Sequence, residues 1–362
     1  MQGELHARRA SGTGSSNDPQ EATLNKKDVE QKKKVRVSDL PDENMLRLVL
    51  MGTGPFAVPS FEALRQAGHE IAMVITRPSR VVRSRKGPPP APVRDWAASH
   101  ELPLDAPDSI NDLSVINRLA EQQADLLVVC DYGQILKPEA LQAARLGGIN
   151  LHGSLLPKYR GAAPVQCALL SGETTTGVSV IHMTPRLDGG PVLTSRETGI
   201  HSHETAGELE ERLAEIGVEA TLDAVRTLGK WDGVANLGVI QDPNSITKAP
   251  RLKKSDAEIN WQLSARMIDC HVRGMQPWPI AFTHFQPVET KPPIRLAIKK
   301  IRVLDKPAAS YSAGEIVPGD QFVVATGDFL IELLEIQPAG KRQMSGIDFL
   351  RGHNPPVGSR LL

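Results

Sequence analysis

Residues 148–164 read GINLHGSLLPKYRGAAP, and Asn150 and His152 stand two residues apart in the short apolar segment that opens this stretch. Side chains at i and i+2 of an extended strand point to the same side, so an amide and an imidazole should converge where the strand ends. Both groups can donate a hydrogen bond to a carbonyl oxygen that gains negative charge. An ordinary polar strand end with a loop behind it fits the same spacing.

The residues that follow turn the chain and add positive charge. Gly153 and Pro157 favour a turn, and Lys158 and Arg160 carry the charge. Gly161 allows another backbone to approach closely.

The run HGSLLPKYRGAAP resembles the signature loop of the methionyl-tRNA formyltransferases, and NLHGSLLP resembles the wider superfamily of folate-dependent formyltransferases. The resemblance extends from about Leu46 to Leu362 and includes LDGGPVL, the QPWPI segment at Trp278 and ATGDFLIELLEIQPAGK. It implies transfer of a formyl group from 10-formyltetrahydrofolate to the free amino group of methionine on initiator tRNA. It also implies a Rossmann-like domain of mostly parallel sheet followed by a small OB-like β-barrel.

The resemblance assigns roles to particular residues. It makes Asn150, His152 and Asp188 the catalytic set. It places the folate along Ser154, Leu155, Leu156 and Pro157, beside the end of the strand at 128–136. Asp131 stands where the family usually has a small residue, so it puts a charge near the folate pocket or faces water.

Composition bounds the class of protein. The 362 residues suffice for two domains, and the formal net charge of zero gives no global field that would attract nucleic acid. Three cysteines without C-x-x-C spacing argue against a disulfide framework and a zinc site. No stretch approaches the roughly 18 to 20 apolar residues that a membrane span needs. We therefore expect a cytoplasmic protein with no metal, and a monomer because no coiled-coil seam or repeat is evident.

Four regions follow from changes in composition. Residues 1–44 are polar, mixed in charge and without an aromatic residue, which predicts a disordered extension rather than a functional arm. Residues 45–229 form the predicted catalytic domain. The glycine- and proline-rich segment 230–254 is the predicted linker, and 255–362 is the predicted C-terminal barrel, which binds tRNA.

Strands and helices alternate in the predicted catalytic domain, which is typical of a parallel sheet with helices on both faces. Ligands of such sheets bind at the carboxyl ends of the strands. The expected strands and helices are 46–52, 56–68, 70–76, 114–123, 124–130, 138–145 and 148–152. Later, Thr205 and Glu208 form a capping box that predicts the start of another helix.

The segment GTGPFA at 52–57 fits a dinucleotide fingerprint after the first strand. The second strand, however, ends on Thr76 and Arg77, where an NAD site would have an acid for the ribose hydroxyls. Arg77 leaves NADP open, but a tight glycine turn between strand and helix is the simpler interpretation.

The loop from Arg77 to Arg94 carries six basic residues and no acid, which indicates a phosphate-rich partner rather than a solvated face. In the family, the corresponding loop contacts the acceptor stem of the tRNA. The sequence VVRSRKGPPP replaces the family's usual glycine-rich, basic run. The positive charge is retained, but the family's individual base contacts are not transferred to these residues. The six residues are Arg77, Arg80, Arg83, Arg85, Lys86 and Arg94.

Asp188 lies in RLDGGP, where two glycines and a proline predict a tight turn. The turn holds the Asp188 carboxylate in place for catalysis, as the resemblance implies, or Asp188 only stabilises its own turn. His182, on the preceding strand, is expected to be structural. His201 and His203 lack further ligands at zinc-like spacing.

Short strands separated by glycine and proline turns predict a small barrel near the C-terminus. From Lys248 to the end, basic residues outnumber acids, with clusters at 252–254, 299–302 and 341–342, and this favours RNA as the partner. Two other functions remain open: the same chemistry on a ribonucleotide or a sugar amine, and a non-catalytic RNA-binding protein of the same fold.

Overall fold

The computed structural model describes residues 45–78, 90–286 and 292–362. The predicted extension 1–44 lies outside the described residues, as do four of the six cations of the basic loop.

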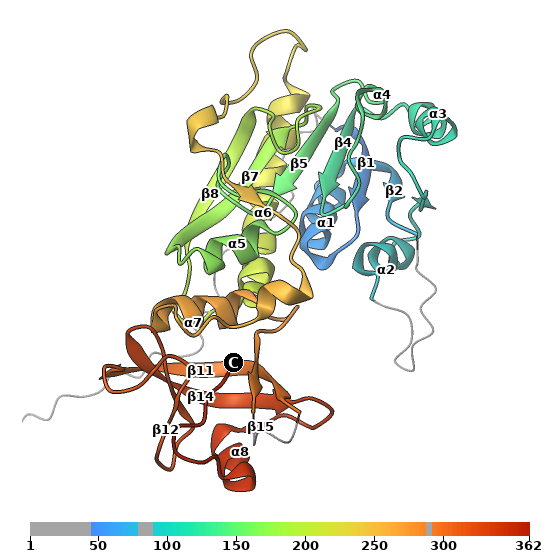
Figure 1. Ribbon diagram of the computed structural model, residues 1–362. Coiled ribbons are helices and arrows are strands. Elements are labelled where there is room, and N and C mark those ends of the chain that lie inside the picture. Colours follow the sequence, from blue (N-terminus) through green and yellow to red (C-terminus); the bar gives the residue numbers. More distant parts are fainter. Residues whose placement is uncertain (1–44, 79–89, 287–291) are drawn as a thin grey trace, which may run out of the picture. The chain divides into compact units, whose positions relative to one another are not determined.

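The first part of the described chain is built on a seven-stranded sheet that is mostly parallel, as predicted (Figure 1). In sheet order the first five strands are parallel to one another. The sixth is antiparallel to the fifth, and the seventh is antiparallel to the sixth. In sheet order the strands are β3 (Leu104–Asp105), β2 (Glu70–Ile75), β1 (Arg47–Gly52), β4 (Leu126–Cys130), β5 (Gly148–His152), β7 (Thr175–His182) and β8 (Val192–Gly199).

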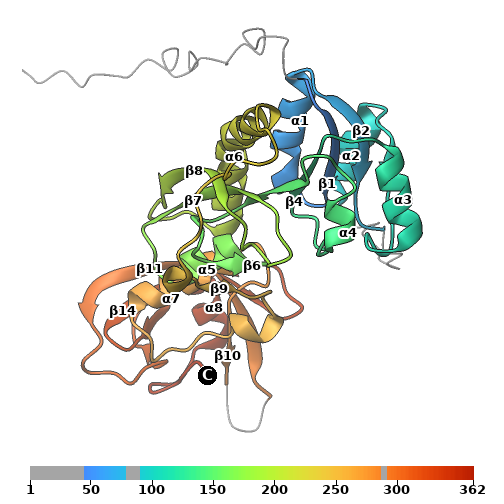
Figure 2. The same ribbon diagram turned by 90° about the horizontal axis from the view of Figure 1, so that it is seen from above.

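The alternation of side chains along β1 explains why helices cover both faces of the sheet. Leu48 and Leu50 join one core cluster, and Val49 and Met51 join another on the opposite face. Figure 2 shows α1 and α6 on one side of β1 and β4, with α4 on the other. The first cluster includes residues of η3 (Pro55–Ala57), α1 (Val58–Gln66), α2 (Pro92–Ser99), α5 (Pro164–Leu170) and α6 (Ala206–Gly229). The second includes residues of α3 (Leu113–Glu121) and α4 (Pro138–Leu141).

Helix α6 begins with the predicted capping box. The Thr205 hydroxyl accepts the Glu208 amide at 3.3 Å, and the Glu208 carboxylate accepts the Thr205 amide at 2.9 Å. Leu209 and Leu213 are buried, as their helical spacing predicts. Helix α4 ends at Leu141 and not at the predicted Arg145. The Arg145 and Leu146 amides instead donate to the carbonyls of Ala124 and Asp125, just before β4.

The C-terminal part is a curled antiparallel sheet with its own core, which confirms the predicted barrel-like second domain. The last residues, 359–362, donate or accept backbone hydrogen bonds at both edges of this sheet, at His284 and at Ile316. The elements are α7 (Ala265–Gly274), β10 (Phe282–Phe285), β11 (Ile294–Pro307), β12 (Ile316–Val317), β13 (Val323–Ala325), β14 (Phe329–Pro338), β15 (Met344–Ser345) and α8 (Gly346–His353).

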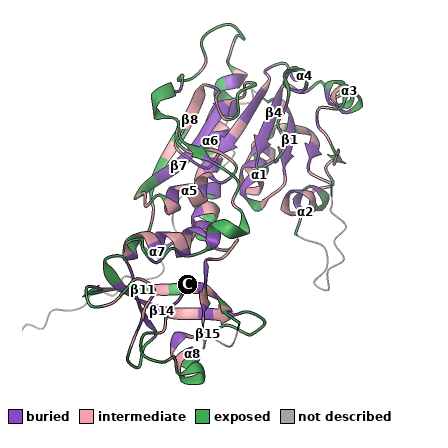
Figure 3. Cartoon of the chain, viewed as in Figure 1, coloured by how far each residue is buried: buried purple, intermediate pink, exposed green. Residues whose placement is uncertain are grey.

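The segment between the two sheets contacts the loop quoted above. It contains η4 (Pro243–Ser245), β9 (Lys248–Ala249) and η5 (Lys254–Ala257). Strand β9 pairs in parallel with β6 (Arg160–Gly161), so the predicted linker lies against the signature loop. Most of this segment is exposed (Figure 3), whereas Ala249 of β9 is buried. Among the described residues, none of the helices combines the length and the apolarity needed to cross a membrane.

Candidate active site

Strand β5 carries Asn150 and His152 to the carboxyl end of the parallel part of the sheet. Ile149 and Leu151, which alternate with them, are buried in the core. The period of two therefore turns the amide and the imidazole away from that core and toward a cavity that both line. His152 is only 5 % exposed.

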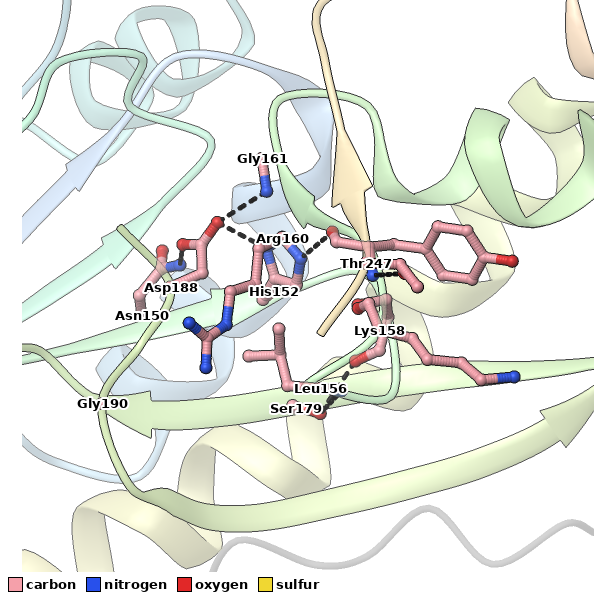
Figure 4. Close-up of polar contacts among 12 residues, drawn as sticks. Asn150, His152, Leu156, Lys158, Arg160, Gly161, Ser179, Asp188, Gly190 and Thr247 are labelled. Atoms are coloured by element: carbon pink, nitrogen blue, oxygen red, sulfur yellow. Dashed lines mark hydrogen bonds and ion pairs between the residues drawn. The ribbon is translucent and has the colours of Figure 1, made fainter. Parts of the chain in front are cut away.

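Asp188 lies in the turn between β7 and β8 and meets both residues, although it is 38 positions from Asn150. Its Oδ1 accepts the Asn150 Nδ2–H at 3.4 Å, and its Oδ2 accepts the backbone N–H of Gly161 at 2.9 Å. The distance from Oδ2 to Nδ1 of His152 is 3.8 Å. The structure thus brings the three predicted catalytic side chains together (Figure 4).

The two ring nitrogens of His152 have different partners. Nε2 lies 2.9 Å from the carbonyl oxygen of Tyr159, and because a carbonyl only accepts, Nε2 carries a hydrogen. Nδ1 faces Asp188 at a distance too long for a hydrogen bond.

The four predicted folate-contacting residues form a loop braced against β7. The Ser154 hydroxyl donates to the Lys158 carbonyl at 2.6 Å, and the Leu156 amide donates to the Ser179 hydroxyl at 3.0 Å (Figure 4). Ser154, Leu155, Leu156 and Pro157 are not among the residues that line the cavity.

The cavity has a volume of about 570 Å³, within the range of about 300 to 1,000 Å³ that is usual for small-molecule sites. Two hydroxyl oxygens of lining residues, Tyr132 Oη and Thr184 Oγ1, are buried without a hydrogen-bond partner. A buried polar atom left unpaired costs free energy. Besides the catalytic set, the wall includes Phe56, 131–136, Gln166, 183–187, Glu210 and Arg251.

Asp131 explains the glycine turn at 52–54. Its carboxylate accepts a hydrogen bond from the Gly54 backbone, and a Cβ on Gly54 would lie 2.0 Å from its Oδ2. A dinucleotide phosphate would need that same amide and would meet the carboxylate's charge. The turn therefore serves close packing and not nucleotide binding.

Glu210 of α6 shares the cavity wall with Asp131. Burial, followed by the charge of Asp131, raises the pKa of Glu210 to about 7. Burial also raises the pKa of Asp131, although the Gly54 hydrogen bond opposes this. Asp131 lines the cavity and is exposed, so water reaches it there.

The remaining sequence candidates lie elsewhere. His182 is tied to the Leu146 carbonyl at 2.9 Å, which agrees with a structural role. All three cysteines are free. In the part of the chain that the structure describes, no group of His, Cys, Asp and Glu is placed to hold a metal. Of the basic loop, Arg77 and Arg94 are described, and Arg94 donates to the Arg77 carbonyl.

Two residues of this region carried no signal in the sequence. Glu210 follows the apolar Leu209 on an amphipathic helix, where an acid is typical of a solvated face. Gln241, whose side chain donates to the Asp188 carbonyl at 2.8 Å, lies in a segment with no periodicity.

Comparison with protein families gives two consecutive matches. Residues 46–225 match the model described as "Formyl transferase", and residues 251–354 match "Formyl transferase, C-terminal domain".

Curated relatives match nearly over their full length. The chain is 59 % identical over 324 residues to "Methionyl-tRNA formyltransferase" of Rhodopirellula baltica, covering 88 % of this chain and 97 % of that protein. It is 38 % identical over 309 residues to the protein of the same name from Methylococcus capsulatus, covering 85 % and 97 %.

Solved structures share the fold at low identity. HypX from Aquifex aeolicus, in complex with tetrahydrofolic acid, has a TM-score of 0.57 at 14 % identity, covering 87 % of this chain and 48 % of its own. WlaRD, a sugar 3N-formyl transferase, has a TM-score of 0.57 at 17 % identity, covering 82 % and 99 %.

Proposed function

The chain belongs to the methionyl-tRNA formyltransferases, and from that premise we propose how its own residues carry out the reaction. Enzymes of this family transfer the formyl group of 10-formyltetrahydrofolate to the free amino group of methionine on initiator tRNA. The observation that carries the assignment of residues is the convergence of Asn150, His152 and Asp188 at one cavity wall.

Asn150 and His152 stabilise the charge that develops on the formyl oxygen. The Asn150 amide and a protonated Nδ1 of His152 are the two donors, and loss of one such donor typically costs about 10² to 10³ in rate. Asp188 keeps the imidazole charged because its carboxylate faces Nδ1.

The amine displaces tetrahydrofolate from the formyl carbon. The proton that the amine loses passes to Asp188, directly or through water, and from this cluster a proton reaches the nitrogen of the leaving tetrahydrofolate. The transfer is direct, because an amine is already a competent nucleophile once it is deprotonated. The residues that line the cavity include no cysteine and no serine. The nearby Cys130 is buried, and burial raises the pKa of its thiol well above the ordinary value.

We propose that the folate lies along the wall at 131–136, where the unpaired Tyr132 hydroxyl is buried. The folate itself supplies the activated formyl carbonyl. The assignment of Ser154, Leu155, Leu156 and Pro157 as folate contacts stays a prediction, since none of them lines the cavity.

The acceptor stem of the tRNA is assigned to the basic loop at 77–94 and to the C-terminal domain. Support in the C-terminal part comes from exposed cations, whereas Arg302 is neutralised by an ion pair with Glu332. The exposed cations are Lys253, Lys254, Lys300, Lys341 and Arg342. We further propose that the protein works as a monomer in the cytoplasm, where charged tRNA is its substrate.

Incubation of the protein with 10-formyltetrahydrofolate and charged initiator tRNA tests the function, with formylmethionyl-tRNA as the expected product. Charged elongator tRNA serves as the control. Formyl transfer to a ribonucleotide or sugar amine in place of the tRNA would overturn the assigned acceptor, and absence of any transfer would overturn the enzyme.

A further inference from the structure

The buried side chain of Gln241 uses all of its hydrogen-bonding capacity around the Asp188 turn. It is 8 % exposed. Its Nε2 donates to the Asp188 carbonyl at 2.8 Å and to the Gly190 carbonyl at 2.7 Å. Its Oε1 accepts from Nε and Nη2 of Arg160, at 3.1 and 2.7 Å. A primary amide offers two hydrogens and two lone pairs, so none is left unused.

The turn that Gln241 holds has an unfavourable backbone. Asp188 has a φ of +48°, in the left-handed region that residues with a Cβ rarely adopt. Gly190 lies so close to the preceding strand that a Cβ there would be 1.8 Å from the His182 carbonyl oxygen. Backbone strain of this kind persists only where the surrounding structure holds it in place. The two carbonyls that Gln241 binds flank this strained segment.

Gln241 also joins this turn to the loop that follows His152. Its partner Arg160 lies in β6, and the Arg160 amide donates to the Thr247 carbonyl at 2.9 Å. The next amide, of Gly161, donates to the Asp188 carboxylate. One side chain from the interdomain segment thus connects both pieces of chain that meet at the catalytic cluster.

We propose that Gln241 is a positioning residue for formyl transfer, which sets the Asp188 carboxylate relative to His152 and Asn150. It touches no substrate and acts through the main chain of Asp188. This inference rests on the proposed function, because it assumes that Asp188 takes part in the reaction.

The first test replaces Gln241 with methionine, which keeps the length of the side chain and removes its four hydrogen bonds. We expect kcat to fall at least tenfold, while KM for initiator tRNA and for the folate changes less than threefold. The matched control is Gln276→Met, because Gln276 also donates from Nε2 to two carbonyls, those of Val272 and Lys299, but away from the turn. This control should lower the melting temperature without lowering kcat.

The second test asks whether Gln241 acts through Asp188. In an Asp188→Asn background, measured in single turnover at high enzyme concentration, Gln241→Met should cause no further loss, because the carboxylate that it positions is gone. Additive losses in the two backgrounds would reduce Gln241 to a structural residue.

A third variant guards against misfolding. Gln241→Glu keeps the contact with Arg160 but sets a carboxylate oxygen against the two carbonyls, so kcat should fall here too in a protein of native circular dichroism. If wild-type protein forms formylmethionyl-tRNA and either folded variant keeps kcat within threefold, this inference fails alone. If wild type forms none, the proposed function fails.

Discussion

At the scale of single residues, His152 has one fixed and one free ring nitrogen. The Tyr159 carbonyl holds Nε2, which leaves Nδ1 between the Asp188 carboxylate and the cavity. His152 and Asp188 both line the cavity, so this nitrogen and the carboxylate face the same space. The amide of Asn150 donates to the same carboxylate, so two donors and one acceptor form a single cluster.

Removal of any member of this cluster should abolish most turnover. We expect Asn150→Ala, His152→Ala and Asp188→Ala each to lower kcat about 10² to 10³-fold with tRNA affinity nearly unchanged, because they serve the transition state. Steady-state kinetics at saturating substrates measure this. His182→Asn is the control, since that ring is bound to the Leu146 carbonyl outside the cavity. Near-wild-type kcat in any of the three variants would remove its assigned role.

Glu210 makes stability depend on pH in a predictable direction. Its pKa is about 7 in the folded protein against 4.5 ordinarily, so the unfolded chain loses this proton first. The stability that the shift contributes is present below about pH 4.5 and is lost as pH rises to 7. The melting temperature of Glu210→Gln minus that of wild type should therefore increase from pH 4.5 to pH 8. Glu215→Gln, at an exposed position of the same helix, is the control, and its difference in melting temperature from wild type should not change with pH. An equal difference at both ends of the range for Glu210→Gln would contradict the assignment.

At the scale of elements, local patterns predicted most of the catalytic domain. The apolar run at 46–52 predicted the first strand, and the Thr205 capping box predicted the start of α6. The period of two along a strand was enough to predict that Asn150 and His152 lie on the same side of it. Pairing between segments far apart in sequence was not predictable: β6 and β9 have two residues each, too few for periodicity, and Gln241 meets Arg160 across 81 positions. The early end of α4 was not predictable either, because the Arg145 amide donates to the carbonyl of Ala124, which is distant in sequence.

The basic loop gives the element-scale prediction, on residues outside those the structure describes. If Arg80, Arg83, Arg85 and Lys86 meet tRNA phosphates, log affinity falls with log salt at about 0.7 to 0.9 per phosphate neutralised. Replacement of all four by Gln should weaken tRNA binding by orders of magnitude at low salt and reduce the slope by up to about three units. Filter binding across a salt series measures this.

Folate affinity is the internal control for the quadruple variant. It should stay constant if these four side chains meet the tRNA and not the folate. An unchanged salt slope would leave tRNA recognition to the C-terminal domain.

At the scale of the whole chain, α7 joins the barrel-like domain to the catalytic domain. Arg266 and Arg273 donate to the carbonyls of Gly172 and Glu204, at 3.2 and 3.0 Å. The amide of Gly207 donates to the Gln276 carbonyl at 3.1 Å. The contact at Gly207 is so close that a Cβ would lie 2.9 Å from a ring carbon of Pro277.

Gly207→Ala should therefore destabilise the protein even though alanine favours helices. Overpacking typically costs about 1 to 3 kcal/mol and exceeds the gain in helix propensity of about 1 kcal/mol. Gly352→Ala, in α8, is the matched control, because a Cβ there meets nothing within 4 Å, so its melting temperature should stay equal or rise. Calorimetry measures both. A melting temperature for Gly207→Ala at or above that of wild type would show that the contact with Pro277 shifts to accommodate the added methyl group.

The pairing of β9 with β6 restricts where this chain can be recombined with another formyltransferase. A chimera could be joined at 229, where α6 ends. The second parent would then supply the residues at positions 241, 247 and 249, which contact the catalytic cluster of the first parent. A breakpoint after 250 keeps these residues with the Asp188 turn they contact. A chimera intended to exchange only tRNA specificity should therefore inherit the interdomain segment from the parent that supplies the catalytic domain.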